Sequence, residues 1–199
     1  MALLEQAPAT LSATARRAMI DSQLRVSGVT DPAVLAAMDS VPREDFVPQS
    51  AQAGAYIDRA LPLGNGQALP APLVHGRMLV EAAIEPGEAV LVVSAADYLP
   101  ALAAHLGAEV ATLSPADAAA ARKGPQVALI LIEGAIERLP AGLAGRLAEG
   151  GRIVTGLVER GVTRLAFGRK IAGEVALLPL AEIGIPVLAE FAAPKRWSF

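Results

Sequence analysis

Apolar and polar residues follow one another along this chain in short blocks whose spacing predicts alternating strands and helices. The five apolar residues at 89–93 form a run of the length of a buried strand, and small residues at 94–97 form a turn after it. An apolar, alanine-rich pattern then begins near Tyr98 and predicts a helix. Parallel sheets place their ligand pocket at the carboxyl end of such a strand, so we expect the chemistry of this chain near 94–97.

The same kind of spacing predicts elements on both sides of this unit. Residues 1–10 are expected to form a loose tail, a helix is expected from Ser12 to Gly28, and Asp31-Pro32 predicts the start of a second helix. The remaining pattern predicts helices at 73–84, 115–123 and 139–147, strands at 109–113, 127–132 and 152–158, and a hairpin of 162–167 with 174–180. We therefore expect an α/β fold with a mostly parallel sheet of about six strands, an antiparallel edge hairpin and an N-terminal helical extension.

A single domain accounts for the whole length of 199 residues, since a chain of this size buries roughly 70% of its unfolded surface in one core. Within 1–199 we expect N-terminal helices and a loop at 1–72 and the core at 73–199. The stretch 41–72 holds five of the fifteen prolines and three glycines, which predicts a long irregular segment. Such a segment in a compact domain is usually functional or packed across a site.

Composition excludes several classes of function. Hydrophobic residues make up 53% of the chain and charged ones 19%, so most of its length is not disordered. A formal charge of −3 without basic clusters excludes a nucleic-acid surface, and the apolar runs are interrupted too early to span a membrane. The absence of cysteine excludes disulfides and thiolate chemistry, and it favours a reducing, cytoplasmic location.

Few single residues carry a chemical signal by themselves. His75 and His105 have no second ligand at metal-binding spacing, so no metal site is expected. Asp97 either caps the helix that begins at Tyr98 or approaches a cofactor, and the cap is the favoured interpretation. Glu133 follows a buried strand and is either a solvated loop acid, the favoured interpretation, or a residue that lines the pocket.

Two further side-chain interpretations concern a charged pair and the carboxyl terminus. Arg43 and Glu44 are interpreted as a simple surface pair. Trp197 is expected to anchor the carboxyl terminus onto the sheet, because aromatic residues so near a chain end are usually held in place.

Several stretches resemble the amino-terminal signature of the protein-L-isoaspartate O-methyltransferases. These are Met19-Ile20-Asp21-Ser22-Gln23-Leu24-Arg25 with Gly28-Val29, Val34-Leu35-Ala36-Ala37-Met38, Val41-Pro42-Arg43-Glu44-Asp45-Phe46-Val47-Pro48, Ala55-Tyr56 with Asp58, and Leu61-Pro62-Leu63-Gly64-Asn65-Gly66-Gln67. Val90-Leu91, Leu139-Pro140 and Leu147 with Glu149-Gly150-Gly151-Arg152 are similar to the framework of the same family. The resemblance covers most of 15–158.

The resemblance implies a Rossmann-like methyltransferase fold and a reaction. In that reaction S-adenosylmethionine gives a methyl group to the α-carboxyl of an L-isoaspartyl residue in a damaged protein, and the ester collapses to a succinimide. The positions it implies for the cofactor are Ser94, Ala96, Asp97 and Ser114, and those of the substrate loop are Asp58, Gly64, Gly66 and Gln67.

The chain departs from the family pattern at these ligand positions. Pro70 replaces the serine whose hydroxyl is associated with catalysis, so no catalytic residue is expected here. Ser94-Ala95-Ala96-Asp97-Tyr98 replaces a glycine-rich cofactor loop, and Ser114 replaces an acid that binds the ribose hydroxyls. The connection 114–126 is too short for the family's third strand, and Gln126-Val127 stands where the fourth strand begins with Phe-Asp.

These departures lead to three hypotheses about function. We expect a family member whose methyl transfer is weak or lost and whose binding of S-adenosylmethionine is impaired. An active repair enzyme would transfer methyl groups onto isoaspartyl peptides. A non-catalytic protein would bind altered peptides through the loop at 55–67, or would act structurally, for example as a homodimer that buries a sheet edge.

Overall fold

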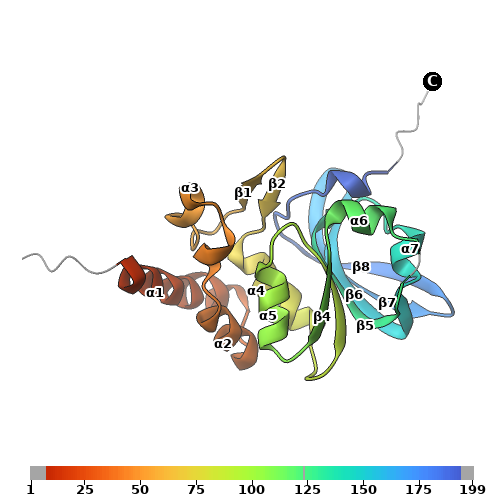
Figure 1. Cartoon of the computed structure of the whole chain (residues 1–199), viewed down its shortest axis with the longest axis horizontal. Coiled ribbons are helices and arrows are strands. Elements are labelled where there is room, and N and C mark those ends of the chain that lie inside the picture. The colour runs from red at the N-terminus through yellow and green to blue at the C-terminus, as the bar shows by residue number, and fades with distance from the viewer. Residues whose placement is uncertain (1–7, 123, 194–199) are drawn as a thin grey trace, which may run out of the picture.

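A six-stranded sheet forms the centre of the computed structural model, which describes residues 8–122 and 124–193 (Figure 1). Its strands stand in the order β4-β3-β5-β6-β7-β8. Their bounds are β3 (Ala89–Val93), β4 (Glu109–Leu113), β5 (Val127–Ile136), β6 (Leu147–Glu159), β7 (Val162–Ile171) and β8 (Glu174–Glu182). The first four in this order run parallel, and β7 and β8 are antiparallel. The predicted fold class, with its six strands and edge hairpin, is confirmed.

Alternating side chains of the central strands build two cores, one on each face of the sheet. Val90 and Val92 of β3 belong to the larger core, whereas Leu91 and Val93 belong to the smaller one. This follows from the period of two in a strand, and it explains why a strand buried on both faces is a continuous apolar run in the sequence.

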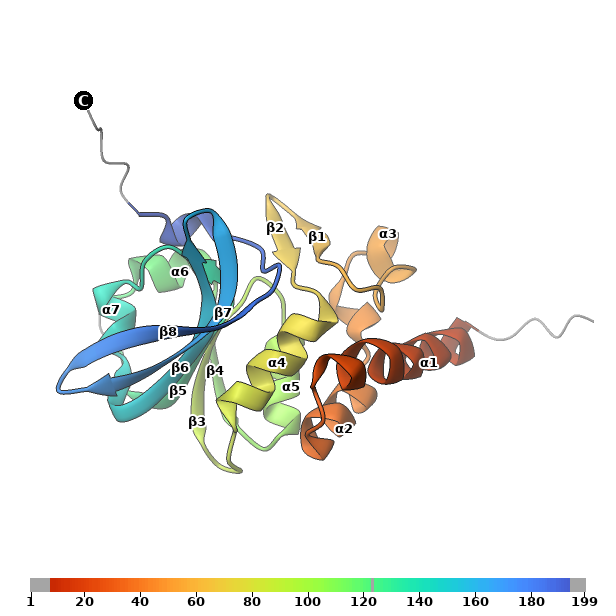
Figure 2. The ribbon, with the colours of Figure 1, turned by 180° about the vertical axis from the view of Figure 1, so that it is seen from behind.

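Helices cover both faces, as Figures 1 and 2 show from opposite sides. The larger core holds α4 (Pro72–Ala82), α5 (Tyr98–His105) and the N-terminal extension. That extension comprises α1 (Pro8–Met19), η1 (Ile20–Leu24), η2 (Arg25–Ser27), α2 (Pro32–Ser40), η3 (Arg43–Phe46) and α3 (Gln49–Gln52). The smaller core packs under α6 (Pro115–Ala120), α7 (Ala141–Ala144) and η4 (Ala189–Phe191).

The first helices begin and end mostly where the sequence predicts. Gly28 takes a left-handed φ of 84° at the end of the first helical stretch, and the Asp31 carboxylate accepts hydrogen bonds from the amides of Ala33 and Val34 at 2.8 and 3.0 Å. The expected start at Ser12 is wrong, because α1 already begins at Pro8. The Ser12 hydroxyl donates to Glu44 instead of capping the helix.

A short hairpin interrupts the segment that was expected to be irregular. Strands β1 (Leu61–Gly64) and β2 (Gln67–Leu69) pair antiparallel, with Gly64 opposite Gln67. The two loop residues, Asn65 and Gly66, have φ angles of 51° and 76°. Positive φ at both positions is typical of the turn that suits the twist of paired strands, and Asn-Gly is its preferred sequence.

The helix predicted at 139–147 is shorter than expected. It covers only Ala141–Ala144, and β6 begins at Leu147, so the residues 149–151 lie within an irregular part of that strand. Glu149 is held there because its carboxylate accepts hydrogen bonds from the amides of Ala172 and Gly173, at the turn between β7 and β8. Trp197 lies outside the described residues, and no helix among the described residues is long and apolar enough to cross a membrane.

Candidate functional site

The candidate site lies at the carboxyl edge of the parallel strands, where β3 ends beside β5. Ser94 follows β3 directly, and its hydroxyl is in hydrogen-bond contact with the Glu133 carboxylate on β5 and with the Ala96 carbonyl. A hydroxyl has one proton to donate, and the charged carboxylate is the stronger acceptor. The amide of Ala96 donates back to the Ser94 oxygen at 2.9 Å.

Glu133 is not the loop acid that the sequence suggested. It lies inside β5, which continues to Ile136, and only 3% of the residue is exposed. Its second carboxylate oxygen, Oε1, lies 2.5 Å from Nε2 of His75 on α4. A buried carboxylate needs such partners, because an unpaired charge in the interior is strongly destabilising.

His75 stands between this carboxylate and a buried arginine. Nη1 of Arg43 lies 3.2 Å from Nδ1 of His75. Since a guanidinium can only donate, Nδ1 is the acceptor and the imidazole proton resides on Nε2, facing Glu133. Burial lowers the pKa of His75 below its ordinary value of 6.5, against the opposite effect of Glu133, and the Arg43 charge lowers it further. The imidazole is therefore held in its neutral form.

Arg43 is fully buried, so the interpretation as a surface pair with Glu44 is wrong. Its Nε donates to the carbonyl of Ala55 at 2.8 Å, and its Nη2 donates to the carbonyl of Pro70. The guanidinium also lies over the ring of Tyr98, 5.2 Å from the ring centroid. Burial lowers the pKa of Arg43, and Tyr98 and Glu133 act in the opposite direction.

Tyr98 completes the buried cluster at the start of α5. Its ring contacts those of His75 and Phe46, with centroid distances of 5.1 and 5.4 Å. Burial raises the pKa of Tyr98, and the Arg43 guanidinium offsets part of that rise. Its hydroxyl has no hydrogen-bond partner among the described residues.

The four positions that the resemblance implies for a cofactor do not converge on one ligand space. Ser94 and Ala96 bond to each other as described above, and Asp97 is exposed. Asp97 stands at the start of α5, but its side chain makes no capping hydrogen bond. Ser114 caps α6 instead, since its oxygen accepts the amide of Asp117 at 3.1 Å and its hydroxyl donates to the Asp117 carboxylate at 2.6 Å.

The positions implied for the substrate loop lie around the β1–β2 hairpin. Gly64 and Gly66 flank the tip at Asn65, Gln67 begins β2, and Asp58 is exposed in the segment before β1. Pro70, at the serine position of the family pattern, is buried directly after the hairpin, where its carbonyl accepts the bond from Arg43.

A small pocket of about 130 Å³ separates the hairpin from the sheet edge. Its walls are Asn65–Ala68 of the hairpin, Ala95 of the turn after β3, and residues 186–190 of the C-terminal segment. That segment is fixed to β5, because the amide of Ala135 donates to the Pro186 carbonyl at 2.8 Å and the amide of Leu188 donates to the Ala135 carbonyl at 2.9 Å. The turn at 94–97 and the hairpin loop, both of which were predicted to carry function, therefore line the same pocket.

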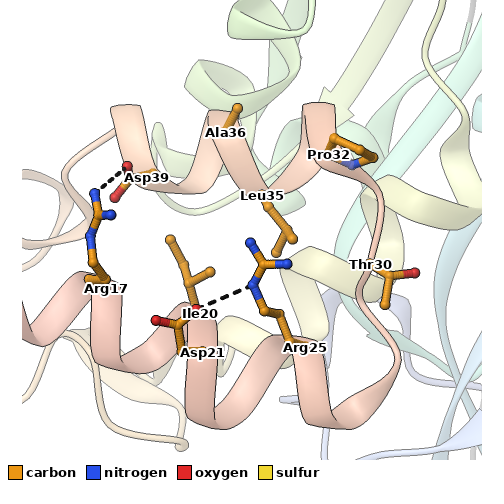
Figure 3. A pocket seen from close by; sticks show the side chains of 9 residues that line it. All are labelled: Arg17, Ile20, Asp21, Arg25, Thr30, Pro32, Leu35, Ala36 and Asp39. Atoms are coloured by element: carbon orange, nitrogen blue, oxygen red, sulfur yellow. Dashed lines mark hydrogen bonds and ion pairs between the residues drawn. The ribbon is translucent and has the colours of Figure 1, made fainter.

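Another pocket lies away from this edge, between α1, η1 and α2 (Figure 3). It has a volume of about 290 Å³, and two ion pairs border it, Arg17 with Asp39 at 3.3 Å and Arg25 with Asp21 at 3.2 Å. Each arginine that borders this pocket is matched by a carboxylate, so the pocket has no charge preference for a ligand.

Comparison with known proteins identifies the family of this chain. The family model "Protein-L-isoaspartate(D-aspartate) O-methyltransferase (PCMT)" matches residues 14–114. The protein-L-isoaspartate O-methyltransferase 2 of an Anaeromyxobacter species is 35% identical over 167 residues, which cover 71% of this chain and 69% of the relative. The chain belongs to the protein-L-isoaspartate O-methyltransferase family.

Other relatives of the family agree with this assignment. The protein-L-isoaspartate O-methyltransferase of Methylorubrum populi is 36% identical over 165 residues, covering 70% of this chain and 78% of that protein. A crystal structure from Plasmodium falciparum, described as a member of the family in complex with S-adenosyl-L-homocysteine, has a TM-score of 0.73 at 18% identity. It covers 88% of this chain and 98% of its own, and it supports the shared fold.

Family membership implies S-adenosylmethionine as the cofactor, but the residues at the carboxyl edge do not fit it. Ser94 and Glu133 directly follow the paired residues of β3 and β5, and their polar groups are already bonded to each other. The turn 94–98 contains no positive φ, so it lacks the conformation that glycines would give. The pocket of about 130 Å³ is below the 300–1,000 Å³ that is typical of small-molecule sites.

Sequence reasoning considered each of the residues that organise the site, but it did not bring them together. Arg43, His75 and Glu133 come from three distant elements, η3, α4 and β5. One signal was present, since Glu133 stands inside an otherwise apolar run at 127–136. A charge within a buried strand must find a partner, and that requirement marks the position.

Proposed function

We propose that this chain is a member of the protein-L-isoaspartate O-methyltransferase family in which methyl transfer is weak or lost and the peptide-facing hairpin is retained. It would act as a non-catalytic binding protein for altered peptides. The observation that carries this proposal is the bond between Glu133 and Ser94, which engages the two polar side chains that directly follow the paired part of β3 and β5.

Glu133 is stabilised in the interior by its two partners, His75 and Ser94. A ligand that takes over these polar groups must displace the carboxylate from His75 and Ser94, and hydrogen bonds to a charged group contribute about 1.5–3 kcal/mol each. A micromolar ligand has only about 8 kcal/mol of binding free energy in total. Displacement would therefore consume about half of the affinity that a methyl donor needs.

Loss of the hydroxyl at position 70 supports the same proposal. Pro70 has neither a side-chain donor nor a backbone N–H, and its carbonyl is already bound to Arg43. The chain would keep the family's substrate class, proteins that contain L-isoaspartyl residues, because the β1–β2 hairpin with Gly64, Gly66 and Gln67 is formed and faces a pocket. We place the protein in the cytoplasm, on the ground that it has no cysteine.

The test is a comparison of two peptides that differ only in an isoaspartyl or an aspartyl linkage. We expect the isoaspartyl peptide to bind more tightly, no methyl ester to form with S-adenosylmethionine, and Gln67→Ala to weaken binding. Gln52→Ala is the matched control, since Gln52 is an exposed glutamine on α3 outside this pocket. Steady formation of methyl ester would overturn the loss of activity, and equal binding of both peptides would overturn the peptide role.

A structural role is the second candidate, favoured by the position of β4. Within the described residues, β4 (Glu109–Leu113) is one of the two outer strands of the six-stranded sheet. An outer strand offers free backbone groups to another chain. A homodimer through β4 would show as a doubled molar mass in light scattering at micromolar concentration, and a constant monomer mass would exclude it.

A further inference from the structure

One side chain holds both ends of the segment that carries the hairpin. Nε of Arg43 donates to the carbonyl of Ala55, and Nη2 donates to the carbonyl of Pro70. These two carbonyls flank residues 56–69, in which β1 and β2 lie. The planar guanidinium can reach both because its donors point in fixed, diverging directions. Arg43 therefore closes the base of the hairpin segment from inside the protein.

The third nitrogen of the same guanidinium connects Arg43 to the sheet edge. Nη1 donates to Nδ1 of His75, Nε2 of His75 donates to Glu133, and Glu133 accepts the hydroxyl of Ser94. This relay runs from the base of the hairpin to the first residue of the turn 94–97. Its middle members are excluded from solvent, with side-chain exposures of 0% for His75 and 1% for Glu133.

The relay joins the two walls of the small pocket at their bases. One wall is Asn65–Ala68 of the hairpin and the other includes Ala95 of the turn. Arg43 holds the hairpin side, and Ser94 holds the turn side. Because the arginine and the glutamate are the two charges of this relay, loss of the carboxylate charge removes the negative charge that favours the buried guanidinium and weakens the hold of Arg43 on the hairpin.

We propose that Arg43 is a positioning residue which, through His75, makes the placement of the β1–β2 hairpin depend on the Glu133 carboxylate at the sheet edge. This inference rests on the proposed function, because it makes two buried charges, linked through His75, responsible for holding the hairpin in the form that receives a peptide.

The experiment is amide hydrogen exchange of the hairpin in the wild-type chain and in Glu133→Gln, under conditions where both are folded. Local loss of support should speed exchange at 61–69 by roughly tenfold, because local opening is governed by local contacts. The conservative variant His75→Gln should leave the hairpin protected, since its amide can accept from Arg43 and donate to Glu133.

A matched control exists at the opposite edge of the sheet. Arg152 donates to the carbonyls of Ala82 and Ala83 and pairs with Glu88 at 2.6 Å, so it has the same kind of partners as Arg43. Glu88→Gln should leave exchange in the hairpin unchanged. Equal effects of Glu88→Gln and Glu133→Gln on 61–69 would overturn the proposal, because they would indicate a general loss of stability.

Further variants keep the proposal testable if Glu133→Gln does not fold. Arg43→Lys retains the charge opposite Glu133 but cannot reach both carbonyls, so it should speed exchange at 61–69; unchanged protection would overturn the proposal.

Peptide binding separates this inference from the proposed function. If Glu133→Gln speeds exchange at 61–69 and the wild-type chain binds no isoaspartyl peptide, the relay is supported and the binding role is refuted. If Glu133→Gln leaves both hairpin exchange and peptide binding unchanged, the relay alone is refuted.

Discussion

His75 donates its Nε2 proton to Oε1 of Glu133 over 2.5 Å, and both side chains are excluded from solvent. The contact ties α4 to β5 at the carboxyl edge of the sheet. Because Arg43 occupies the other ring nitrogen, a second proton on His75 would place two donors and two positive charges against each other. The fold therefore requires a neutral imidazole.

Stability should fall as the pH drops below the ordinary pKa of histidine. The pKa of His75 is lowered in the folded chain, so the unfolded chain takes up a proton near pH 6.5 while the folded chain does not. Above pH 6.5 the imidazole is neutral in both the folded and the unfolded chain, so His75 adds no pH dependence to the free energy of unfolding. Below it, each pH unit should remove about 1.4 kcal/mol of the free energy of unfolding, until the folded chain is also protonated.

Urea denaturation between pH 7.5 and 5.5 measures this slope. His75→Gln should remove it, because glutamine keeps both hydrogen bonds and does not titrate in this range. His105→Gln is the matched control, since the exposed His105 is the only other histidine in the sequence and should leave the slope unchanged. A slope that survives in His75→Gln would show that another group causes it.

The two charges of the relay should depend on each other. Arg43→Met and Glu133→Gln should each cost about 3–5 kcal/mol, because each leaves the opposite member buried without compensation. The double variant should be more stable than the sum of the two losses predicts, by about 0.5–3 kcal/mol. Denaturation of the four chains measures this coupling, and strict additivity would mean that His75 does not connect the two charges.

A bulkier residue at position 134 should disturb the C-terminal segment. A Cβ on Gly134 would clash with the side chain of Leu188, which lies against it. Overpacking of this kind typically costs about 1–3 kcal/mol, so Gly134→Ala should lower the midpoint of thermal unfolding. Leu188→Ala leaves room for the new methyl group, so the combination with Gly134→Ala should cost less than the two changes added. A neutral Gly134→Ala would show that this contact is not tight.

The sheet could be predicted from the sequence because its strands are marked by local patterns. The expected strands at 89–93 and 109–113 have the observed bounds, since a short apolar run between turn residues leaves few alternatives. The edge hairpin was also expected, although β7 and β8 extend further than their predicted segments. Strands of this kind are determined by the local spacing of apolar and turn residues.

The β1–β2 hairpin was missed although its turn carries a strong signal. Asn65-Gly66 is the preferred pair for a two-residue hairpin loop, and the surrounding prolines obscured it. Pro62 is compatible with a strand here because it lies in a two-stranded hairpin with a free edge on each side in the described chain, where a missing N–H can be tolerated.

The buried relay could not be predicted, because it depends on contacts between distant positions. Arg43 and His75 are 32 residues apart, and His75 and Glu133 are 58 apart. The sequence indicates that Glu133 stands in an apolar run, but not which cation reaches it. Spacing alone leaves that choice open, and only the packing of η3 and α4 against β5 decides it.

The most direct test of this account is a calorimetric titration of the wild-type chain with S-adenosylmethionine and S-adenosylhomocysteine, together with thermal unfolding in excess ligand. We expect no binding up to millimolar ligand from a chain that unfolds cooperatively, because the polar groups of Glu133 and Ser94 are already bonded to each other. Ligand at a hundred times its dissociation constant would stabilise the fold by about 2.7 kcal/mol, which raises the midpoint by roughly 5–11 °C. Micromolar binding with such a rise would contradict the account.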